Sequence, residues 1–301
     1  MPLRANLLDE LSRRQLQCGA WGALACSDQP VIESSCLAAL VSEIGSKTRV
    51  GAEQFLLRAQ NPNGSWPALL GDDQEGAWVT SLAVMALSDS VPATPSRLKG
   101  YEWLIGFSGK EANWFWKWKF RTTDRKVRFD PDQYGWPWFP GTVSWVVPTS
   151  FSILALKQAP CTCGLFEPIR LRLERGTKML LDRACPSGGW NAGNGVVYGA
   201  PLAPHPDDTA VALLALTAQK DLPLVRQSLR YLEGTASRLR APASLAWAVL
   251  ALAAHQRPVN SLQSRLSAFA ELRHIEDTGT LAALCLALEC RGSLSMLGIH
   301  S

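Results

Sequence analysis

The sequence predicts an all-α protein folded as a single toroid of six inner and six outer helices, an (α/α)6 arrangement. Three observations support this. Six pairs of helical segments alternate along the 301 residues, and in each pair a more polar segment precedes an almost wholly apolar one. A helix that is apolar all round has to be buried, whereas one charged on a single face belongs outside. An inner ring of apolar helices satisfies both, while a straight solenoid would leave them half exposed.

The third observation is an internal repeat, since a hydroxyl residue recurs where the apolar helices start: Thr80, Thr149, Thr209, Ser244 and Thr280. Outer helices are expected at about 4–18, 47–60, 96–106, 168–184, 223–236 and 259–272. Inner helices are expected at about 32–44, 77–88, 148–158, 207–219, 243–255 and 278–290. Proline occupies a first turn at Pro95, Pro168 and Pro223, where its missing N–H costs nothing. Residues 1–301 are therefore interpreted as one toroid domain.

Composition limits where the chain works. Apolar residues make up 47% of the sequence, and no apolar run reaches the length of a membrane span. The first eleven residues form an amphipathic segment without a cleavage site, which does not resemble a signal peptide. The eight cysteines form no pair of Cys-x-x-Cys units, although Cys161-x-Cys163 could bind a metal or be redox active. We expect a cytoplasmic protein, with association to a membrane surface left open.

A finer signature marks the turns between outer and inner helices. A glutamine, then glycine four residues later and tryptophan two residues after that, occur twice, and a third turn keeps the glycine and tryptophan but has Ala184 for the glutamine. The residues are Gln15, Gly19 and Trp21; Gln60, Gly64 and Trp66; and Gly188 with Trp190. A glutamine at a helix end can bond free backbone groups while the indole packs over the turn. These residues are interpreted as clamps between hairpins.

The glutamine–tryptophan signature resembles the QW repeats of squalene–hopene and oxidosqualene cyclases. More broadly, the helical pattern is similar to the toroids of class II terpene cyclases and of protein prenyltransferase β subunits. The resemblance implies the toroid fold and, for the cyclases, a proton-initiated cyclisation of an isoprenoid. The zinc of the prenyltransferases is not expected, because the four histidines lack an accompanying Asp-x-Cys segment.

The acid of class II cyclases lies in an Asp-x-Asp-Asp-Thr-Ala motif, and this chain keeps its last four residues at Asp207–Ala210, with His205 in place of the first aspartate. By that resemblance Asp207 is the catalytic acid and Asp208 its neighbour. His205 could hold the proton arrangement or simply belong to the loop. Two adjacent carboxyls in a dry pocket cannot both ionise cheaply, so one stays protonated, as alkene protonation requires. The alternative is that either aspartate only caps the helix that follows.

Residues 109–146 form a long insert between the third outer and inner helices, and they carry six of the twelve tryptophans. Alternation from Asn113 to Arg121 predicts a β-hairpin that places Trp114, Trp116 and Trp118 on one face. Such a face could roof the toroid and stabilise a carbocation, or only pack the lid down. The expected substrate-binding side chains are Trp78, Trp114, Trp116, Trp118, Lys119, Arg121, Tyr134, Trp136, Trp138 and Trp145.

Charge is concentrated in this insert: six positive residues and one negative lie between Lys117 and Arg128, against a net charge of +4 for the chain. The basic face could meet a substrate diphosphate, an anionic membrane surface or only water. Two acidic groups, Asp72-Asp73-Gln74-Glu75 and Asp130-Pro131-Asp132, compete for the acid role, and the first could hold Mg²⁺. No cofactor or bound metal is otherwise expected, with Mg²⁺ needed only for a diphosphate substrate.

The sequence thus predicts a cyclase acting on a polyprenyl small molecule, without nucleic-acid partners. The alternative is a non-catalytic toroid that binds an isoprenoid or a protein through the same mouth. In the familiar cyclases the cavity lies between two toroids, whereas this chain is long enough for one. The insert, a second copy in a homodimer, or another protein would then close the cavity.

Overall fold

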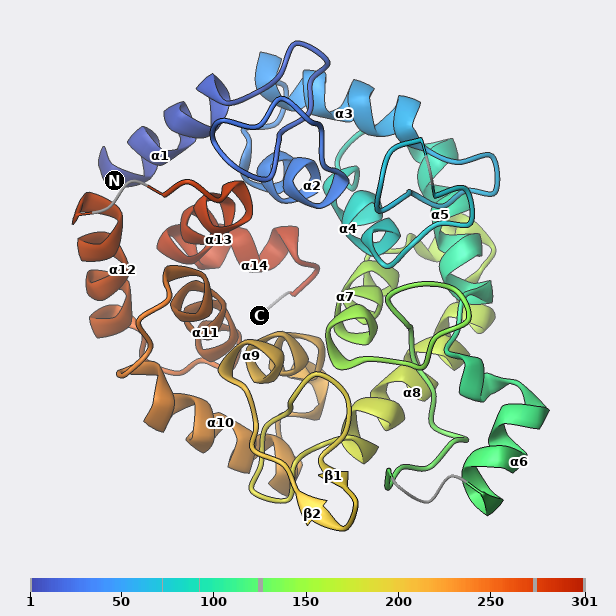
Figure 1. The fold of residues 1–301 in the computed structure, drawn as a ribbon. Coiled ribbons are helices and arrows are strands. Elements are labelled where there is room, and N and C mark those ends of the chain that lie inside the picture. The colour runs from blue at the N-terminus through green and yellow to red at the C-terminus, as the bar shows by residue number, and fades with distance from the viewer. Residues whose placement is uncertain (1, 72, 92, 124–126, 273–274, 300–301) are drawn as a thin grey trace.

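The computed structural model describes residues 2–71, 73–91, 93–123, 127–272 and 275–299. Six inner helices form a closed ring, because each contacts the next and the last contacts the first (Figure 1). They are α2 (Ile32–Val41), α4 (Val79–Ala86), α7 (Val146–Lys157), α9 (Pro206–Ala215), α11 (Pro242–Ala254) and α13 (Thr278–Glu289). The outer ring contains α1 (Pro2–Arg13), α3 (Lys47–Ala59), α5 (Thr94–Gly106), α8 (Phe166–Asp182), α10 (Pro223–Ala236) and α12 (Asn260–Leu272). The predicted (α/α)6 toroid is confirmed.

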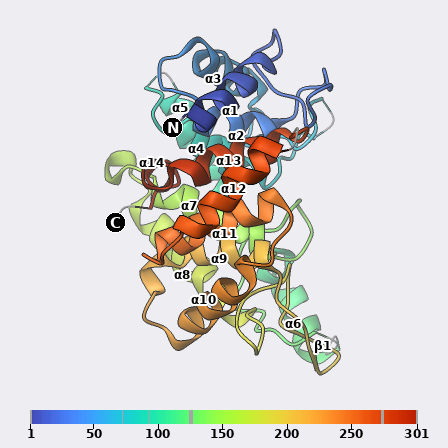
Figure 2. The same ribbon diagram turned by 90° about the vertical axis from the view of Figure 1, so that its left-hand side faces the viewer.

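The inner helices run parallel, because every outer-to-inner connection is made at the same end of the ring. Their N-termini therefore gather at one end, which we call the mouth, and their C-termini at the other, which we call the closed end. The short helix α14 (Arg291–Met296) lies across the closed end (Figure 2). None of the helices in the described part of the chain is both long and apolar enough to cross a bilayer.

Burial follows from composition. In α9 all seven residues from Thr209 to Ala215 are buried. The same holds for every residue of α4. Alanines in these helices allow the close approach that a ring of this size needs, and the larger side chains fill the core between the rings. Short 3₁₀ turns at Lys110–Ala112, Cys161–Cys163 and Thr217–Gln219 complete the connections.

The glutamines of the repeated turns tie neighbouring hairpins together. Gln15 Nε2 donates to the carbonyl of Gly19 in its own turn, at 2.9 Å, and to that of Thr48 on the next outer helix, at 2.8 Å. The second repeat makes the same two bonds, from Gln60 to the carbonyls of Gly64 and Ser96, at 2.9 and 2.8 Å. Each glutamine therefore joins the turn after its own outer helix to the first turn of the next outer helix.

The tryptophans of these turns fill the space between the two rings. Each indole N–H donates to an outer-helix carbonyl, from Trp21, Trp66 and Trp190 to Leu11, Leu56 and Leu180, at 2.7, 2.7 and 2.6 Å. Their backbone N–H groups donate to a hydroxyl of the following inner helix, on Ser35, Thr80 and Thr209, each at 2.9 Å. The repeating hydroxyl is therefore the acceptor that fixes each turn.

Trp136 makes the same two bonds and is the fourth tryptophan of this kind. Its indole donates to the Leu104 carbonyl at 2.8 Å, and its backbone N–H donates to Thr149 Oγ1 at 3.0 Å. Its side chain is 0% exposed, and the buried Arg172 guanidinium stacks on its ring at 3.8 Å. The sequence predicts substrate binding for Trp136; the structure instead places it between the rings as a turn clamp.

The predicted β-hairpin in the insert is wrong: residues Trp114–Thr122 form an α-helix, α6. Asn113 caps it by accepting the backbone N–H of Phe115 at 2.9 Å. In the helix Trp114 and Trp118, four residues apart, share a face, whereas Trp116 lies on a different side. The only sheet among the described residues pairs β1 (Val196–Val197) with β2 (Ala200–Pro201), in the connection before α9.

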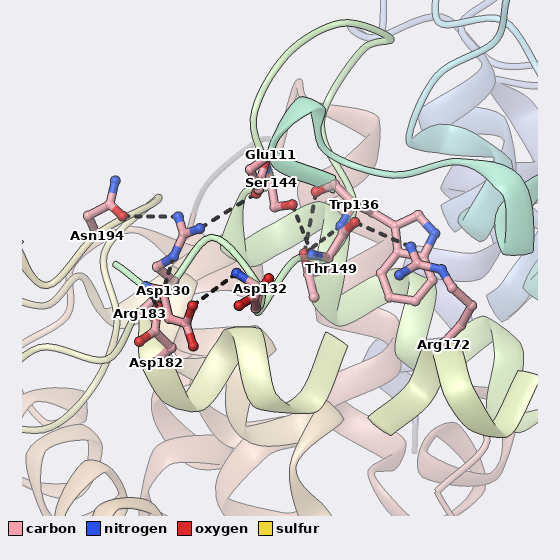
Figure 3. A network of polar contacts seen from close by, with 11 residues as sticks. Glu111, Asp130, Asp132, Trp136, Ser144, Thr149, Arg172, Asp182, Arg183 and Asn194 are labelled. Carbon is pink, nitrogen blue, oxygen red and sulfur yellow. Dashed lines mark hydrogen bonds and ion pairs between the residues drawn. The ribbon is translucent and has the colours of Figure 1, made fainter. Parts of the chain in front are cut away.

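Helix α6 lies outside the ring at its lower right in Figure 1, so this part of the insert does not roof the mouth. A buried network holds the insert there (Figure 3). Glu111, which is 0% exposed, accepts the Ser144 N–H at 3.0 Å and lies 3.5 Å from Nη2 of Arg183. Arg183 also donates to Asn194 at 3.0 Å and stacks on Phe129 at 4.0 Å. These contacts fix Glu111, Phe129 and Ser144 of the insert against the end of α8.

Candidate active site

A cavity of about 490 Å³ lies on the axis at the mouth, and residues of all six inner helices or their first-turn flanks line it. Its lining combines carboxylates, aromatic rings and aliphatic side chains. The lining residues are Ala23, Val31, Glu33, Ser34, Leu37, Trp78, Leu82, Trp138, Val147, Phe151, Asp207, Val211, Ala243, Trp247, Asp277, Gly279 and Thr280. This volume falls in the range of small-molecule sites.

Three carboxylates enter the cavity at helix N-termini. Glu33 is the second residue of α2, Asp207 is the second residue of α9, and Asp277 is the N-cap of α13. The partial positive charge of a helix N-terminus favours negative side chains at these positions. Asp277 has a capping role, because its Oδ1 accepts the N–H of Thr280 at 2.6 Å. Within the described residues neither Glu33 nor Asp207 accepts a hydrogen bond, so both carboxyls are available to a ligand.

Glu33 holds its proton more tightly than an ordinary glutamate. Burial raises its pKa, and the negative charge of Asp277 raises it further. Much of the surface of Glu33 is accessible, but this surface lines the cavity, where the surrounding protein reduces the solvation of the ionised form. The cavity therefore contains a carboxyl whose pKa is raised.

Four aromatic side chains form a connected cluster on the wall of the cavity. Trp78 meets Trp138 edge to face with ring centroids 4.9 Å apart, and lies 5.8 Å from Phe151. Phe151 in turn lies 5.7 Å from Trp247, again edge to face. Each aromatic ring can stabilise a cation by about 0.5–2 kcal/mol, with the larger value in a dry site. Together they supply a surface suited to a positively charged intermediate.

The charged side chains that line the cavity are all acidic among the described residues. The described residues around the cavity include three carboxylates and no lysine, arginine or histidine. A diphosphate would therefore find no positive side chain there to bind it. The described residues also contain no group of three or more histidine, cysteine, aspartate or glutamate side chains arranged to hold a metal ion.

The two adjacent aspartates, Asp207 and Asp208, lie in different surroundings. Asp208 is not among the lining residues, and its Oδ2 lies 3.0 Å from Nδ1 of His205. Burial raises the pKa of Asp208, while the bond to His205 acts in the opposite direction. His205 itself has a 62% exposed side chain. The structure therefore places Asp207 in the cavity and the His205–Asp208 pair beside it.

The remaining predicted aromatic residues do not gather at the cavity. Among the ten predicted binding residues only Trp78 and Trp138 line it. Trp114 and Trp118 are exposed on α6, while Trp116 lies under Lys110 and Lys119, whose ammonium groups are 4.3 and 4.7 Å from its ring. The common face expected for Trp114, Trp116 and Trp118 does not exist.

Tyr134 and Trp145 contact protein rather than the cavity. The Arg175 guanidinium donates to the Tyr134 hydroxyl and stacks over its ring at 4.7 Å. The ring of Trp145 packs on Gly193, where a Cβ would lie 3.1 Å from it. Arg121, also predicted to bind substrate, pairs with Asp132 on the outside of the ring.

The competing acidic groups have structural partners. Asp73 accepts the N–H groups of Ala68 and Gly76, each at 2.9 Å, and so shapes its own loop. Asp72 lies outside the described residues. Asp130 accepts the N–H of Asp132 at 2.9 Å. Neither group reaches the axial cavity.

Sequence reasoning missed Glu33, Asp277, Phe151 and Trp247. Glu33 and Phe151 could have been found from their positions relative to the hydroxyl residue that recurs in each repeat. Counted from the hydroxyl that holds each turn (Ser35, Thr80, Thr149 and Thr209), the residue two positions before it lines the cavity in all four repeats: Glu33, Trp78, Val147 and Asp207. The residue two positions after it also does: Leu37, Leu82, Phe151 and Val211. Recognising Ser35 as the first hydroxyl would have placed Glu33 in the same lining register as Asp207.

The fold and this cavity define the chain as an (α/α)6 toroid with an axial site of carboxylates and aromatic rings. No family model and no curated protein sequence matches the chain. A variant of the type II terpene cyclase MstE from Scytonema, in complex with its product merosterolic acid A, aligns with a TM-score of 0.60 at 13% identity, over 98% of each chain. The endo-β-1,4-glucanase CMCax from Acetobacter xylinum aligns with a TM-score of 0.61 at 13% identity, over 97% of this chain and 98% of that one.

An α-amylase from Clostridium perfringens aligns equally well, with a TM-score of 0.61 at 10% identity over 96% of this chain and 98% of that one. At such identities these similarities establish the toroid fold. They do not assign an activity, because the same fold serves enzymes of different chemistry.

Proposed function

We propose that the protein is a proton-initiated isoprenoid cyclase whose reaction takes place in the axial cavity. One observation carries the proposal: the carboxyl of Asp207 and the aromatic cluster of Trp78, Phe151 and Trp247 line the same cavity. An acid and a set of cation-stabilising rings are the two components that such a reaction needs. That MstE, a chain of similar length, is described as a type II terpene cyclase supports cyclisation by a single toroid.

In this mechanism the carboxyl group of Asp207 donates a proton to a terminal carbon–carbon double bond of the substrate. The resulting tertiary carbocation is attacked by the electrons of the next double bond, which closes a ring and moves the positive charge along the chain. The aromatic cluster stabilises each cation and excludes water that would quench it. Loss of a proton to a carboxylate of the cavity, such as Asp277, forms the final double bond and leaves the proton count unchanged.

Glu33 is the second candidate for the proton donor, because its raised pKa favours the neutral form. The roles of Glu33 and Asp207 are separable by experiment, since the two lie on different helices. Because the lining contains no basic side chain among the described residues, the substrate end that enters the cavity is proposed to be uncharged hydrocarbon.

The test is incubation of the purified protein with squalene, with geranylgeraniol and with farnesyl and geranylgeranyl diphosphates, with products identified by mass spectrometry. Asp207→Asn and Glu33→Gln are compared with Asp208→Asn, the matched neighbour outside the cavity. A cyclic product lost in Asp207→Asn and retained in Asp208→Asn supports the assignment. A substrate that binds all variants equally and is never turned over would instead indicate a binding protein.

Glycoside hydrolysis is a second candidate, favoured by carboxyls on different helices facing tryptophan rings across one cavity. Glycosidases use two carboxyl groups on opposite sides of the scissile bond, and sugars stack on aromatic faces. Cello- and malto-oligosaccharides are therefore included in the same assay. Release of reducing ends that depends on both Glu33 and Asp207 would replace the cyclase proposal.

A further inference from the structure

Exposed aromatic side chains concentrate at one end of the toroid. Among the described residues, the aromatic side chains of Trp114, Phe115, Trp118, Phe139, Phe166 and Tyr198 are at least 47% exposed. All of these except Phe166 lie in outer-to-inner connections, which lead to the mouth. Phe166 begins α8 and so lies toward the closed end. Helix α6 and strand β1 lie on the side of the ring opposite α14 (Figure 2).

Three of these residues form a continuous stripe on α6. Trp114 is 76% exposed, Trp118 55% and Phe115 47%. The Phe115 ring lies 6.0 Å from that of Trp114 and 6.3 Å from that of Trp118. Large aromatic surfaces this exposed are unusual on a soluble face and commonly mark an interaction site.

The opposite face of α6 is fixed to the protein, so the stripe is held outward. Trp116 packs against Phe120 at 5.9 Å, and Phe120 packs edge to face on Phe129 at 5.1 Å. Lys117 and Arg121 both pair with Asp132. The helix thus presents its aromatic stripe from a convex projection at the edge of the ring (Figure 1).

Basic side chains flank the stripe. In the helical register Lys119 lies on one side of it, and Lys117 and Arg121 lie on the other. Six positive residues and one negative residue occur between Lys117 and Arg128. Tryptophan and phenylalanine on one face with lysine and arginine beside them is the pattern of a helix that lies in a bilayer interface.

We propose that α6 docks the mouth side of the toroid onto an anionic lipid bilayer. Trp114, Phe115 and Trp118 enter the headgroup region, where an indole can place its ring in apolar surroundings and its N–H in water. Lys119, together with Lys117 and Arg121, whose two positive charges exceed the single carboxylate of Asp132 that pairs with them, attracts lipid phosphates. A protein partner would be expected to meet a flat or grooved patch, whereas this stripe lies on a projecting helix and has basic side chains on both sides. The inference goes beyond the proposed function and does not require it.

The experiment measures co-sedimentation of the full chain with sucrose-loaded vesicles of phosphatidylcholine alone and of equimolar phosphatidylcholine and phosphatidylserine. The variants are Trp114→Ser/Trp118→Ser, Lys119→Gln/Arg121→Gln, and Phe166→Ser as the matched exposed aromatic at the other end. Circular dichroism checks that all variants fold. The oligomeric state of each is measured by light scattering.

The expected result is binding to the anionic vesicles that weakens with salt, with a partition coefficient reduced about tenfold or more in the tryptophan variant. The charge variant is expected to lose the preference for phosphatidylserine, and Phe166→Ser to bind like the wild type. The proposal is overturned if the wild type binds neither vesicle, or if Phe166→Ser and the tryptophan variant bind alike. It is also overturned if the wild type is a dimer that the tryptophan variant dissociates, because the stripe is then a protein interface.

Discussion

The two ends of the toroid meet opposite poles of the inner-helix dipoles, and the charged side chains at the two ends have different roles. At the closed end, positive side chains donate to carbonyls in the last turns of the inner helices. Arg49 donates to the carbonyls of Ala39 and Ala86 at the ends of α2 and α4, and Lys157 donates to that of Ala215 at the end of α9. These cations cap the C-terminal ends of the inner helices and are therefore not available to a ligand.

At the mouth, three negative side chains lie at helix N-termini, where the dipole favours them, but two of the three do not cap a helix. Asp277 caps α13, whereas Asp207 and Glu33 have no hydrogen-bond partner among the described residues and face a cavity. The comparison teaches that the dipole explains where charge is placed. Only the absence of a structural partner beside an open cavity indicates a function.

The largest effect is expected from Asp207→Asn at the mouth. Loss of a positioned proton donor lowers kcat by about a thousandfold, within the range for general acids. The free energy of unfolding is expected to change by less than about 1 kcal/mol, because only an interaction with the dipole is lost. Product formation and urea unfolding are measured on the same preparation. A large loss of stability would show that Asp207 is a cap, like the cations of the closed end.

The converse is expected of Arg49→Met at the closed end. Arg49 is 2% exposed, and its removal leaves the Ala86 carbonyl without a donor, the Ala39 carbonyl with only the Ser42 N–H, and Glu53 without its ion-pair partner. An unsatisfied buried group costs about 1–3 kcal/mol, so a loss of roughly 3 kcal/mol in unfolding free energy is expected. Turnover at a temperature where the variant is folded should be nearly unchanged. If Arg49→Met instead abolishes turnover without lowering stability, the division between the two ends is wrong.

The closed end is harder to predict from the sequence than the mouth, because capping cations have no pattern of their own. Arg49 lies in a charged outer helix and resembles any surface arginine; only the ring geometry brings it to two carbonyls. The inner helices could be predicted because a uniformly apolar helix has to be buried on every side. The turn clamps could be predicted because the Gln-x-x-x-Gly-x-Trp pattern repeats at helix ends, and Asp207 because it precedes an apolar helix in a motif with chemistry.

The insert was predicted least well. The tryptophans of α6 alternate in sequence, which is the pattern of a strand, but in the helix that forms Trp116 lies on a different side from Trp114 and Trp118. Ser35 was also missed as a repeat hydroxyl, so Glu33 was not placed in the cavity with Asp207. In the last two repeats, Ser244 and Thr280 are one position out of register, since Ala243 and Trp247 line the cavity in α11. Without a Gly-x-Trp turn before these helices, nothing in the sequence fixes their rotation.

A smaller effect is expected within the mouth. Phe151→Leu keeps a buried apolar side chain but removes the ring between Trp78 and Trp247. Loss of one cation–π contact should lower kcat about tenfold, with KM little changed. Trp114→Leu on α6 serves as control and should leave turnover of detergent-dispersed substrate unchanged. Equal effects of the two substitutions would argue against a carbocation in the cavity.

The smallest effects are expected in the pH dependence of stability, where the two ends should differ in sign. The pKa of Glu33 is raised in the folded chain, so the folded state binds the proton more tightly than the unfolded state. Stability from this group is full below the unfolded value of 4.5 and falls as the pH rises through the folded pKa. Glu33→Gln should remove this fall, which is measured as the difference between the urea unfolding free energies of the two proteins across pH.

Lys157 should give the opposite slope. Burial lowers its pKa from 10.5 to about 8 in the folded chain. Between these values the unfolded chain binds a proton that the folded chain has released, so stability rises with pH, by at most about 1.4 kcal/mol per pH unit for one proton. Lys157→Met should lack this rise, while Glu33→Gln should retain it. If the stability instead changed with pH in the same direction at both ends, general charge repulsion would account for the pH dependence rather than Glu33 and Lys157. The contrast between an open acidic mouth and a capped basic end would then lose its electrostatic basis.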